Sequence, residues 1–161
     1  MTRYIEVNPE KCTACRICEY TCSTFHFGEI NPAKSRIKVD IIARDFFYFP
    51  VVCQQCAKAP CVEVCPKEAL VRNEDTGAVE VVAENCIGCR KCVKACPFGA
   101  MNVIKGEKVA NKCDLCGGDP QCVKHCFYGT LEFKESEKVS EDIRLAYISK
   151  VKAAQEKEEA I

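Results

Sequence analysis

Four groups of cysteines account for every cysteine in this 161-residue chain and constrain its fold more than any other feature. The first and third groups have two, two and three residues between successive cysteines, whereas the second has two, four and three and the fourth two, five and three. A spacing repeated so strictly indicates ligands of metal centres around which the chain folds. The groups are Cys12, Cys15, Cys18 and Cys22; Cys53, Cys56, Cys61 and Cys65; Cys86, Cys89, Cys92 and Cys96; and Cys113, Cys116, Cys122 and Cys126.

Composition and the N-terminal sequence narrow the class of protein. The 48% apolar content includes the 16 cysteines, so the other apolar side chains make a thin core for this length. Lys plus Arg and Asp plus Glu both number 23, which argues against a nucleic-acid partner. The opening residues MTRYIEVNPEKC lack the apolar stretch of a secretory signal, and the most apolar run, 41–52, is too short to span a bilayer. We therefore expect a soluble, cytoplasmic protein without a membrane span.

Zinc and disulfides are the alternatives to iron–sulfur clusters. A zinc ribbon also uses paired CxxC motifs, but it does not need a third cysteine two residues on and a fourth three residues beyond that. A disulfide scaffold has no reason to repeat one spacing, and the cytoplasm keeps thiols reduced. Three thiolates in one tight loop can bind three irons of a cubane, whereas the fourth cysteine cannot reach its last corner. The spacing therefore favours 4Fe–4S clusters.

The stretch CVEVCPKEALVRNEDTGAVEVVAENCIGCRKCVKACPFGA, residues 61–100, resembles a two-cluster bacterial ferredoxin. Over residues 4–133 the four motifs together resemble the four-cluster, ferredoxin-like electron-transfer subunits of molybdenum and tungsten oxidoreductases, formate dehydrogenases and hydrogenases. The segment INPAKSRIKV is similar to one in the small subunits of tungsten aldehyde oxidoreductases and of the tungsten benzoyl-CoA reductase. The resemblance implies two nested bacterial-ferredoxin-like units, with 1–52 and 105–135 forming the outer unit and 53–104 the inner one.

The resemblance also implies how the cysteines are shared. In bacterial ferredoxins the fourth cysteine of a motif binds the cluster of the paired motif. Carried over to this chain, the pattern gives four 4Fe–4S clusters. Their ligands would be Cys53, Cys56, Cys61 and Cys96; Cys86, Cys89, Cys92 and Cys65; Cys12, Cys15, Cys18 and Cys126; and Cys113, Cys116, Cys122 and Cys22. Each thiolate-bound cluster carries roughly −2 when oxidised and −3 when reduced, so the loaded protein would be acidic despite its formal net charge of zero.

The outer motifs depart from the family pattern. Pro66 and Pro97 follow the closing cysteines of the inner motifs and fix φ there, whereas Ser23 and Phe127 stand at those places in the outer motifs. This departure predicts a different environment for the outer pair of clusters. Gly88 lies inside a cluster loop, where we expect the backbone to approach inorganic sulfide closely. No histidine ligand is expected, because sixteen cysteines already complete four clusters.

Between the motifs we expect short secondary structure and hence an α+β fold. Gly77 lies in the turn of the first of three predicted strand pairs, and a one-turn helix is expected after a closing cysteine, at 67–69 for example. The last segment, 136–161, should be a helical tail, with a helix over 140–160 whose apolar stripe packs on its own domain or docks another subunit. The strand pairs are 69–72 with 79–83, 101–104 with 108–110, and 4–7 with 130–133.

The segment 23–52 is extra to a simple ferredoxin and holds six of the thirteen Phe and Tyr residues. It either packs over the clusters and shields them from water, or it presents an aromatic patch to a partner. A fixed subunit is favoured by this segment and by the terminal helix, since an electron shuttle needs only a small, transient interface.

The sequence contains no motif for bond-making chemistry, so we expect no enzyme activity from the chain itself. It has no G-x-S-x-G elbow, no P-loop and no dinucleotide fingerprint. We expect it to conduct electrons between a larger molybdenum- or tungsten-pterin catalytic subunit, of aldehyde oxidoreductase type, and another redox partner such as a flavin or iron–sulfur subunit. The alternative is a free polyferredoxin that shuttles electrons between enzymes.

Overall fold

The computed structural model describes residues 2–42, 47–136 and 149. In this part of the chain, four two-stranded antiparallel sheets alternate with short helices, which agrees with the expected α+β class. The elements are β1 (Thr2–Val7), α1 (Ile17–Phe27), β2 (Lys38–Ile42), β3 (Phe47–Val51), α2 (Pro60–Glu63), β4 (Leu70–Arg72), β5 (Val79–Val81), α3 (Lys91–Ala95), β6 (Met101–Val103), β7 (Ala110–Lys112), α4 (Gln121–Lys124) and β8 (Leu131–Ser136).

The three predicted strand pairs all form. β1 pairs with β8 from Thr2 opposite Ser136 to Val7 opposite Leu131, and β4 pairs with β5. The pair β6–β7 also forms, but its second strand begins at Ala110 instead of Lys108. The reason is that the backbone carbonyl of Lys108 lies against Gly88 in the third cysteine motif, so this residue belongs to the connecting loop.

Helices α2, α3 and α4 end before the closing cysteines of their motifs, whereas α1 runs through Cys22 to Phe27. The helix predicted at 67–69 does not form, so that prediction is wrong. That segment is a turn in which Glu68 has a left-handed φ of 48°. The N–H of Ala69 donates to the sulfur of Cys65 at 3.3 Å, so this amide turns back toward the thiol.

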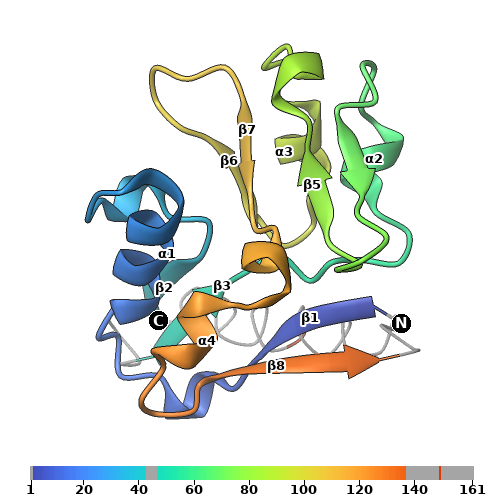
Figure 1. The fold of residues 1–161 in the computed structure, drawn as a ribbon. Coiled ribbons are helices and arrows are strands. Elements are labelled where there is room, and N and C mark those ends of the chain that lie inside the picture. The colour runs from blue at the N-terminus through green and yellow to red at the C-terminus, as the bar shows by residue number, and fades with distance from the viewer. Residues whose placement is uncertain (1, 43–46, 137–148, 150–161) are drawn as a thin grey trace.

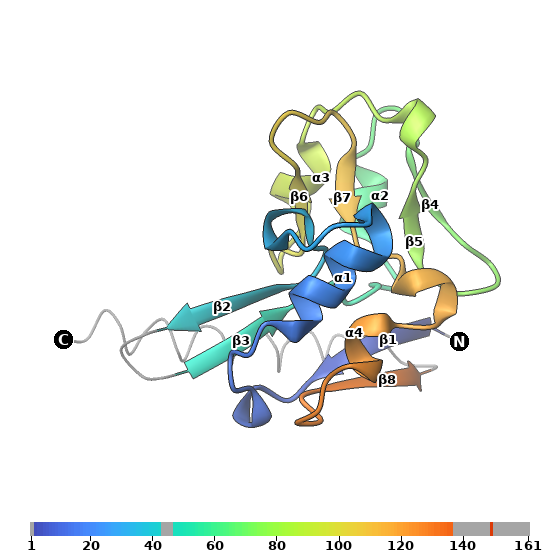
Figure 2. The same ribbon diagram turned by 60° about the vertical axis from the view of Figure 1, so that its left-hand side comes forward.

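The two ends of the described chain lie together, and the middle of the chain forms the upper part of the molecule. Figure 1 shows β1 and β8 side by side at the bottom, with α2, α3, β5, β6 and β7 above them. In Figure 2 the hairpin β2–β3 extends sideways from the lower part, beneath α1. Helix α1 packs against α4, and α2 packs against α3. The motif pairs that the resemblance implies therefore occupy neighbouring helices.

Cysteines form much of the interior, as the low content of other apolar residues predicts. The larger cluster of buried apolar side chains includes Ile5, Val52 and Leu115, none of them measurably exposed. Leu70 and Val79 lie in the smaller one. The cysteines of these two clusters are Cys18, Cys22, Cys53, Cys113 and Cys122 in the larger and Cys61 and Cys92 in the smaller.

The segment 23–52 completes α1 and forms the β2–β3 hairpin. Phe49 is buried and stacks on Phe47, with 6.0 Å between ring centroids, whereas Phe25 is 53% exposed. The segment therefore places aromatic side chains both in the interior and at the surface. The helix predicted over 140–160 lies outside the described residues, apart from Ser149. In the described part of the chain, no helix has the length and apolar character needed to cross a membrane.

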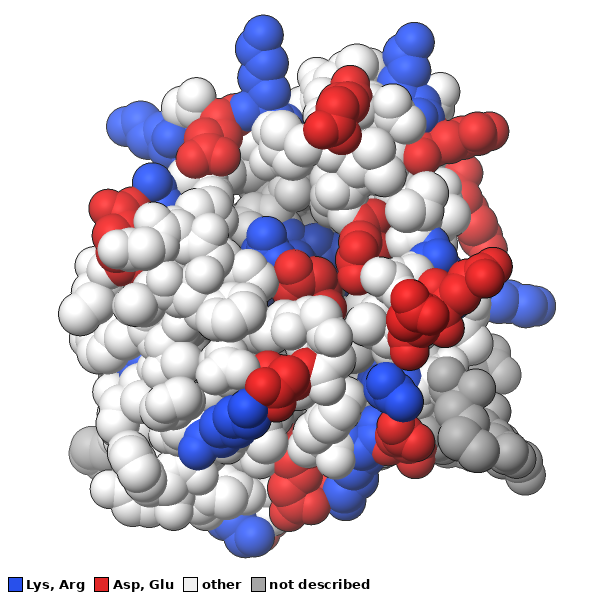
Figure 3. Space-filling model, viewed as in Figure 1, with Lys and Arg blue, Asp and Glu red and all other residues white. Residues whose placement is uncertain are grey.

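Charged side chains of both signs are mixed over the surface. On the face that Figure 3 shows, Lys and Arg lie among Asp and Glu both around the edge and near the centre, and a wide uncharged area lies on the left-hand side. Several of these side chains form ion pairs, such as Arg3 with Glu135 at 2.6 Å and Lys34 with Glu29 at 2.7 Å. This face offers no extended basic surface of the kind that binds nucleic acid.

Candidate metal centres

Twelve of the cysteines line three cavities in sets of four, and the other four make up the remaining set that the resemblance implies; we call these sets sites 1 to 4. Each set combines three cysteines of one motif with the closing cysteine of another. Cavities that are lined by the thiols show sites 1, 3 and 4 directly. Site 1 is Cys12, Cys15, Cys18 and Cys126; site 2 is Cys22, Cys113, Cys116 and Cys122; site 3 is Cys53, Cys56, Cys61 and Cys96; and site 4 is Cys65, Cys86, Cys89 and Cys92.

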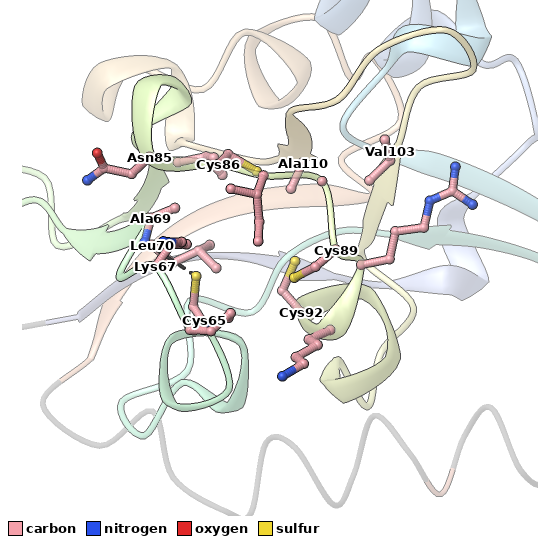
Figure 4. Close-up of a pocket in the computed structure, with 16 residues that line it drawn as sticks. Cys65, Lys67, Ala69, Leu70, Asn85, Cys86, Cys89, Cys92, Val103 and Ala110 are labelled. Atoms are coloured by element: carbon pink, nitrogen blue, oxygen red, sulfur yellow. Dashed lines mark hydrogen bonds between the residues drawn. The ribbon is translucent and has the colours of Figure 1, made fainter.

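Site 4 shows how the two motifs meet. In Figure 4 the side chains of Cys65, Cys86, Cys89 and Cys92 point into one space, although Cys65 comes from a different loop. Most other residues around this space are apolar, and they include Leu70, Val81 and Val103.

Site 2 is the set that the family resemblance implies for the remaining four cysteines. Burial raises the pKa of Cys122 well above its usual range, and the neighbouring thiols Cys113, Cys22, Cys116 and Cys18 raise it further. The other three cysteines of site 2 therefore lie near Cys122, as does Cys18 of site 1. The three sets that line cavities contain the cysteines that the family resemblance groups together, and the ligand sets themselves stay a prediction.

One backbone feature recurs in every motif: the residue before the second cysteine has a left-handed φ. The angles are 54° at Ala14, 46° at Gln55, 70° at Gly88 and 58° at Leu115. Such residues turn successive N–H groups toward one point, and backbone of this kind surrounds many iron–sulfur sites. The N–H of Gln55 lies 3.4 Å from the sulfur of Cys53, and those of Ala14 and Leu115 donate in the same way to Cys12 and Cys113.

Only Gly88 among these four positions could be foreseen. Left-handed backbone costs an L-residue about 1–2 kcal/mol, so glutamine and leucine give no local signal for it. What the four positions share in the sequence is their place two residues after the first cysteine of a motif. At Gly88 a Cβ would lie 2.7 Å from the carbonyl oxygen of Lys108, so the backbone also packs closely against a neighbouring loop, and the expected approach to sulfide stays a prediction.

The third cysteine of each motif is the second residue of a helix and is buried: Cys18 in α1, Cys61 in α2, Cys92 in α3 and Cys122 in α4. Burial raises the pKa of Cys18 to about 12 and that of Cys61 to about 11. Thiols in such surroundings keep their protons unless a cation replaces them. Metal binding at these sites would therefore release protons.

Two side chains beside site 2 were not identified from the sequence. The backbone N–H of Arg36 donates to Cys22 at 3.3 Å, and its guanidinium pairs with Asp114 at 2.5 Å. His26, which was not expected to be a ligand, has Nε2 3.7 Å from the sulfur of Cys116 and 3.4 Å from Asp114. Burial lowers the pKa of His26, as does Arg36, so its neutral form is favoured.

Four thiols in each set, largely withdrawn from water and met by backbone N–H groups, are the donor set of a 4Fe–4S cluster. In the described residues the cysteines form no disulfide. His125 lines the cavity of site 1, but its Nδ1 lies 2.8 Å from the carbonyl oxygen of Gln121 and its side chain is exposed. The residues present therefore fit the clusters without a histidine.

Comparisons with known proteins agree with this donor set. A family model described as a 4Fe-4S dicluster domain matches residues 44–136, and one described as a 4Fe-4S binding domain matches residues 9–24. The polyferredoxin-like subunit of an aliphatic sulfonate oxidoreductase from Pyrococcus furiosus is 45% identical over 121 residues, which cover 72% of this chain and 66% of that protein.

Two further similarities point the same way. The electron transport protein HydN of Escherichia coli K12 is 38% identical over 136 residues, covering 72% of this chain and 77% of that protein. Among solved structures, the active site complex BamBC of benzoyl coenzyme A reductase has a chain with a TM-score of 0.52 and 26% identity, over 94% of this chain and 89% of that one. Relatives of this kind are named electron-transport proteins or subunits, which indicates a non-catalytic role. The chain belongs to the 4Fe–4S dicluster family of ferredoxin-like electron-transfer proteins.

Proposed function

We propose that this chain holds four 4Fe–4S clusters and conducts single electrons along them between a catalytic oxidoreductase subunit and a second redox partner. The observation that supports the proposal is that three sets of four cysteines, each drawn from two motifs, line cavities of the fold. The clusters would supply one-electron oxidation and reduction, and the protein would hold them, shield them and set their potentials.

We infer that the four sites follow one another in a row. The thiol of Cys18 in site 1 raises the pKa of Cys122 in site 2, and the thiol of Cys53 in site 3 raises the pKa of Cys113 in site 2. Site 2 therefore lies next to both site 1 and site 3. Sites 3 and 4 exchange their closing cysteines, because Cys96 serves site 3 and Cys65 serves site 4. The order 1–2–3–4 supports a continuous path for electrons.

The two ends of this row are the sites open to solvent. Cys15 in site 1 and Cys89 in site 4 are the exposed cysteines, whereas Cys113 and Cys122 of site 2 are buried. Exposed apolar side chains lie in the loops next to both ends: Phe127 and Tyr128 follow Cys126, and Ile87 lies between Cys86 and Cys89. Electrons would enter and leave the chain at these ends.

The partner that we propose is a larger molybdenum- or tungsten-pterin subunit of aldehyde oxidoreductase type, with a flavin or iron–sulfur subunit accepting electrons at the other end. The similarity to an oxidoreductase subunit and to a chain of the BamBC complex supports a fixed partner. We also propose that 1–52 with 105–135, and 53–104, are nested ferredoxin-like units, since the sites draw their ligands from within these segments.

Anaerobic purification tests the proposal. Four 4Fe–4S clusters correspond to about sixteen iron and about sixteen sulfide per chain. A protein that contains zinc and no sulfide would refute the cluster assignment. Native mass spectrometry of the chain from its own host then tests the partner, because a stable complex with a pterin-containing subunit is expected. A protein found only as a monomer would support the free polyferredoxin instead.

A further inference from the structure

Lys112 is a buried cation at the centre of the row of sites. It is the last residue of β7, directly before Cys113, and its side chain is 3% exposed. A lysine is almost never buried to this extent unless another charge is paired with it. The surroundings of its ammonium group therefore require an explanation.

The ammonium group has three acceptors, and all of them are neutral. Nζ donates to Oε1 of Gln55 at 3.0 Å, to the carbonyl oxygen of Val79 at 2.6 Å and to that of Cys113 at 3.0 Å. A protonated amine has three N–H donors, one for each oxygen, whereas a neutral amine has two and would turn its lone pair toward an oxygen. The geometry thus matches the charged form.

No carboxylate balances this charge. In the described part of the chain Lys112 forms no ion pair, although Asp and Glu side chains pair with several other lysines. A buried charge without a counter-ion costs several kcal/mol, so such groups are normally paired. The negative charge nearby must come from another source.

The surrounding thiols identify that source. Lys112 lines the cavity of site 3, and its ammonium bonds the carbonyl of Cys113, a cysteine of site 2. Gln55, which is completely buried, connects the same groups: its amide donates to the Cys113 carbonyl at 3.0 Å, and its oxygen also accepts from the N–H of Val79 at 2.9 Å. The charge of Lys112 also opposes the rise that burial causes in the pKa of the Cys61 and Cys113 thiols.

We propose that Lys112 is the internal counter-charge of the two central clusters, at sites 2 and 3, and that it raises their reduction potentials. The inference rests on the proposed function. Each one-electron reduction adds one negative charge to a cluster and changes no covalent bond of the protein, so a fixed positive charge nearby favours the reduced form. Lys112 would thereby keep the middle of the row accessible to electrons that cross between the outer and inner units.

The test compares Lys112→Gln, Lys112→Met and Lys112→Arg with Lys108→Gln, which removes one charge from an exposed position in the loop that leads into β7. Iron and sulfide are measured first, and an anaerobic redox titration followed by electron paramagnetic resonance then gives the potential of each cluster. In Lys112→Gln we expect two of the four potentials to become more negative. The ratio of reduced to oxidised cluster at a fixed potential should fall about tenfold, which is 59 mV for one electron. Lys112→Arg and Lys108→Gln should stay near the wild type.

The outcomes separate this inference from the proposed function. A wild-type protein without iron and sulfide refutes the proposed function. A fully loaded Lys112→Gln with unchanged potentials, or an equal shift in Lys108→Gln, refutes the role of Lys112 alone. If Lys112→Gln and Lys112→Met both lose their clusters, Lys112→Arg is decisive. Full cluster content in Lys112→Arg supports the need for a positive charge. Loss of clusters in Lys112→Arg shows that the packing of the lysine matters, and it overturns the inference.

Discussion

Replacing Gly88 by alanine should damage site 4 far more than the same change at Gly28 damages the end of α1. The two glycines have nearly the same φ, 70° and 69°. An alanine at either position therefore pays the same cost of about 1–2 kcal/mol for left-handed backbone. They differ in space: a Cβ at Gly88 would lie 2.7 Å from the carbonyl oxygen of Lys108, whereas one at Gly28 would have nothing within 4 Å.

The additional cost at Gly88 can be worked from this contact. The obstacle is a backbone atom in the loop between β6 and β7, so relief requires a shift of the whole loop. Overpacking of this kind costs about 1–3 kcal/mol, and Gly88→Ala should therefore lose about 2–5 kcal/mol in total. The excess over Gly28→Ala corresponds to about a 5- to 150-fold increase in the fraction of molecules in which the site is open.

The assay is the rate at which a chelator removes iron under anaerobic conditions, together with the iron content of the purified protein. Gly88→Ala should lose the iron of one cluster, about a quarter of the total, much faster than the rest. Gly28→Ala should behave like the wild type in chelation and differ only in overall stability. Equal rates for the two variants would show that the contact with Lys108 does not constrain the site, and the reasoning would be refuted.

Three further predictions test the structure. Glu19 is 1% exposed, and its carboxylate accepts from the N–H of Val39 at 2.9 Å and from Arg16 at 2.5 Å. In a denaturant titration, Glu19→Leu should therefore lower the free energy of unfolding by about 1–3 kcal/mol. Glu19→Gln should lower it less. Cys61 is a buried cysteine, so Cys61→Ser should lose iron and fold poorly, as measured by circular dichroism. Cys89 is exposed, so Cys89→Ser should keep its fold and most of its iron. A well-folded Cys61→Ser variant without iron would contradict this expectation. Complete removal of iron at neutral pH should abolish the near-ultraviolet circular dichroism signal. The reason is that the buried cysteines are part of the interior, so the packing of the fold depends on the clusters that they bind. An unchanged spectrum would show that the polypeptide packs without metal.

Elements that carry their own sequence pattern were predictable, whereas boundaries and burial that depend on contacts with other segments were not. The strand pair that joins residues 4–7 to 130–133 was correct because each run carries its own β-pattern. The start of β7 was misplaced by two residues because Lys108 is held by Gly88, twenty positions away in the chain. Lys112 gave no sign of burial, since its three acceptors come from separate loops and strands.

The shared cysteines also impose an order on assembly at the ribosome. Under the proposed ligand sets, sites 3 and 4 have all their thiols once synthesis has passed Cys96. Site 1 holds three of its four thiols from Cys18 onward but lacks the last until Cys126 emerges, and site 2 is complete only at Cys122. A nascent chain would thus carry its first motif without a full set of thiols through most of translation, so the outer pair of clusters would be completed after the inner pair.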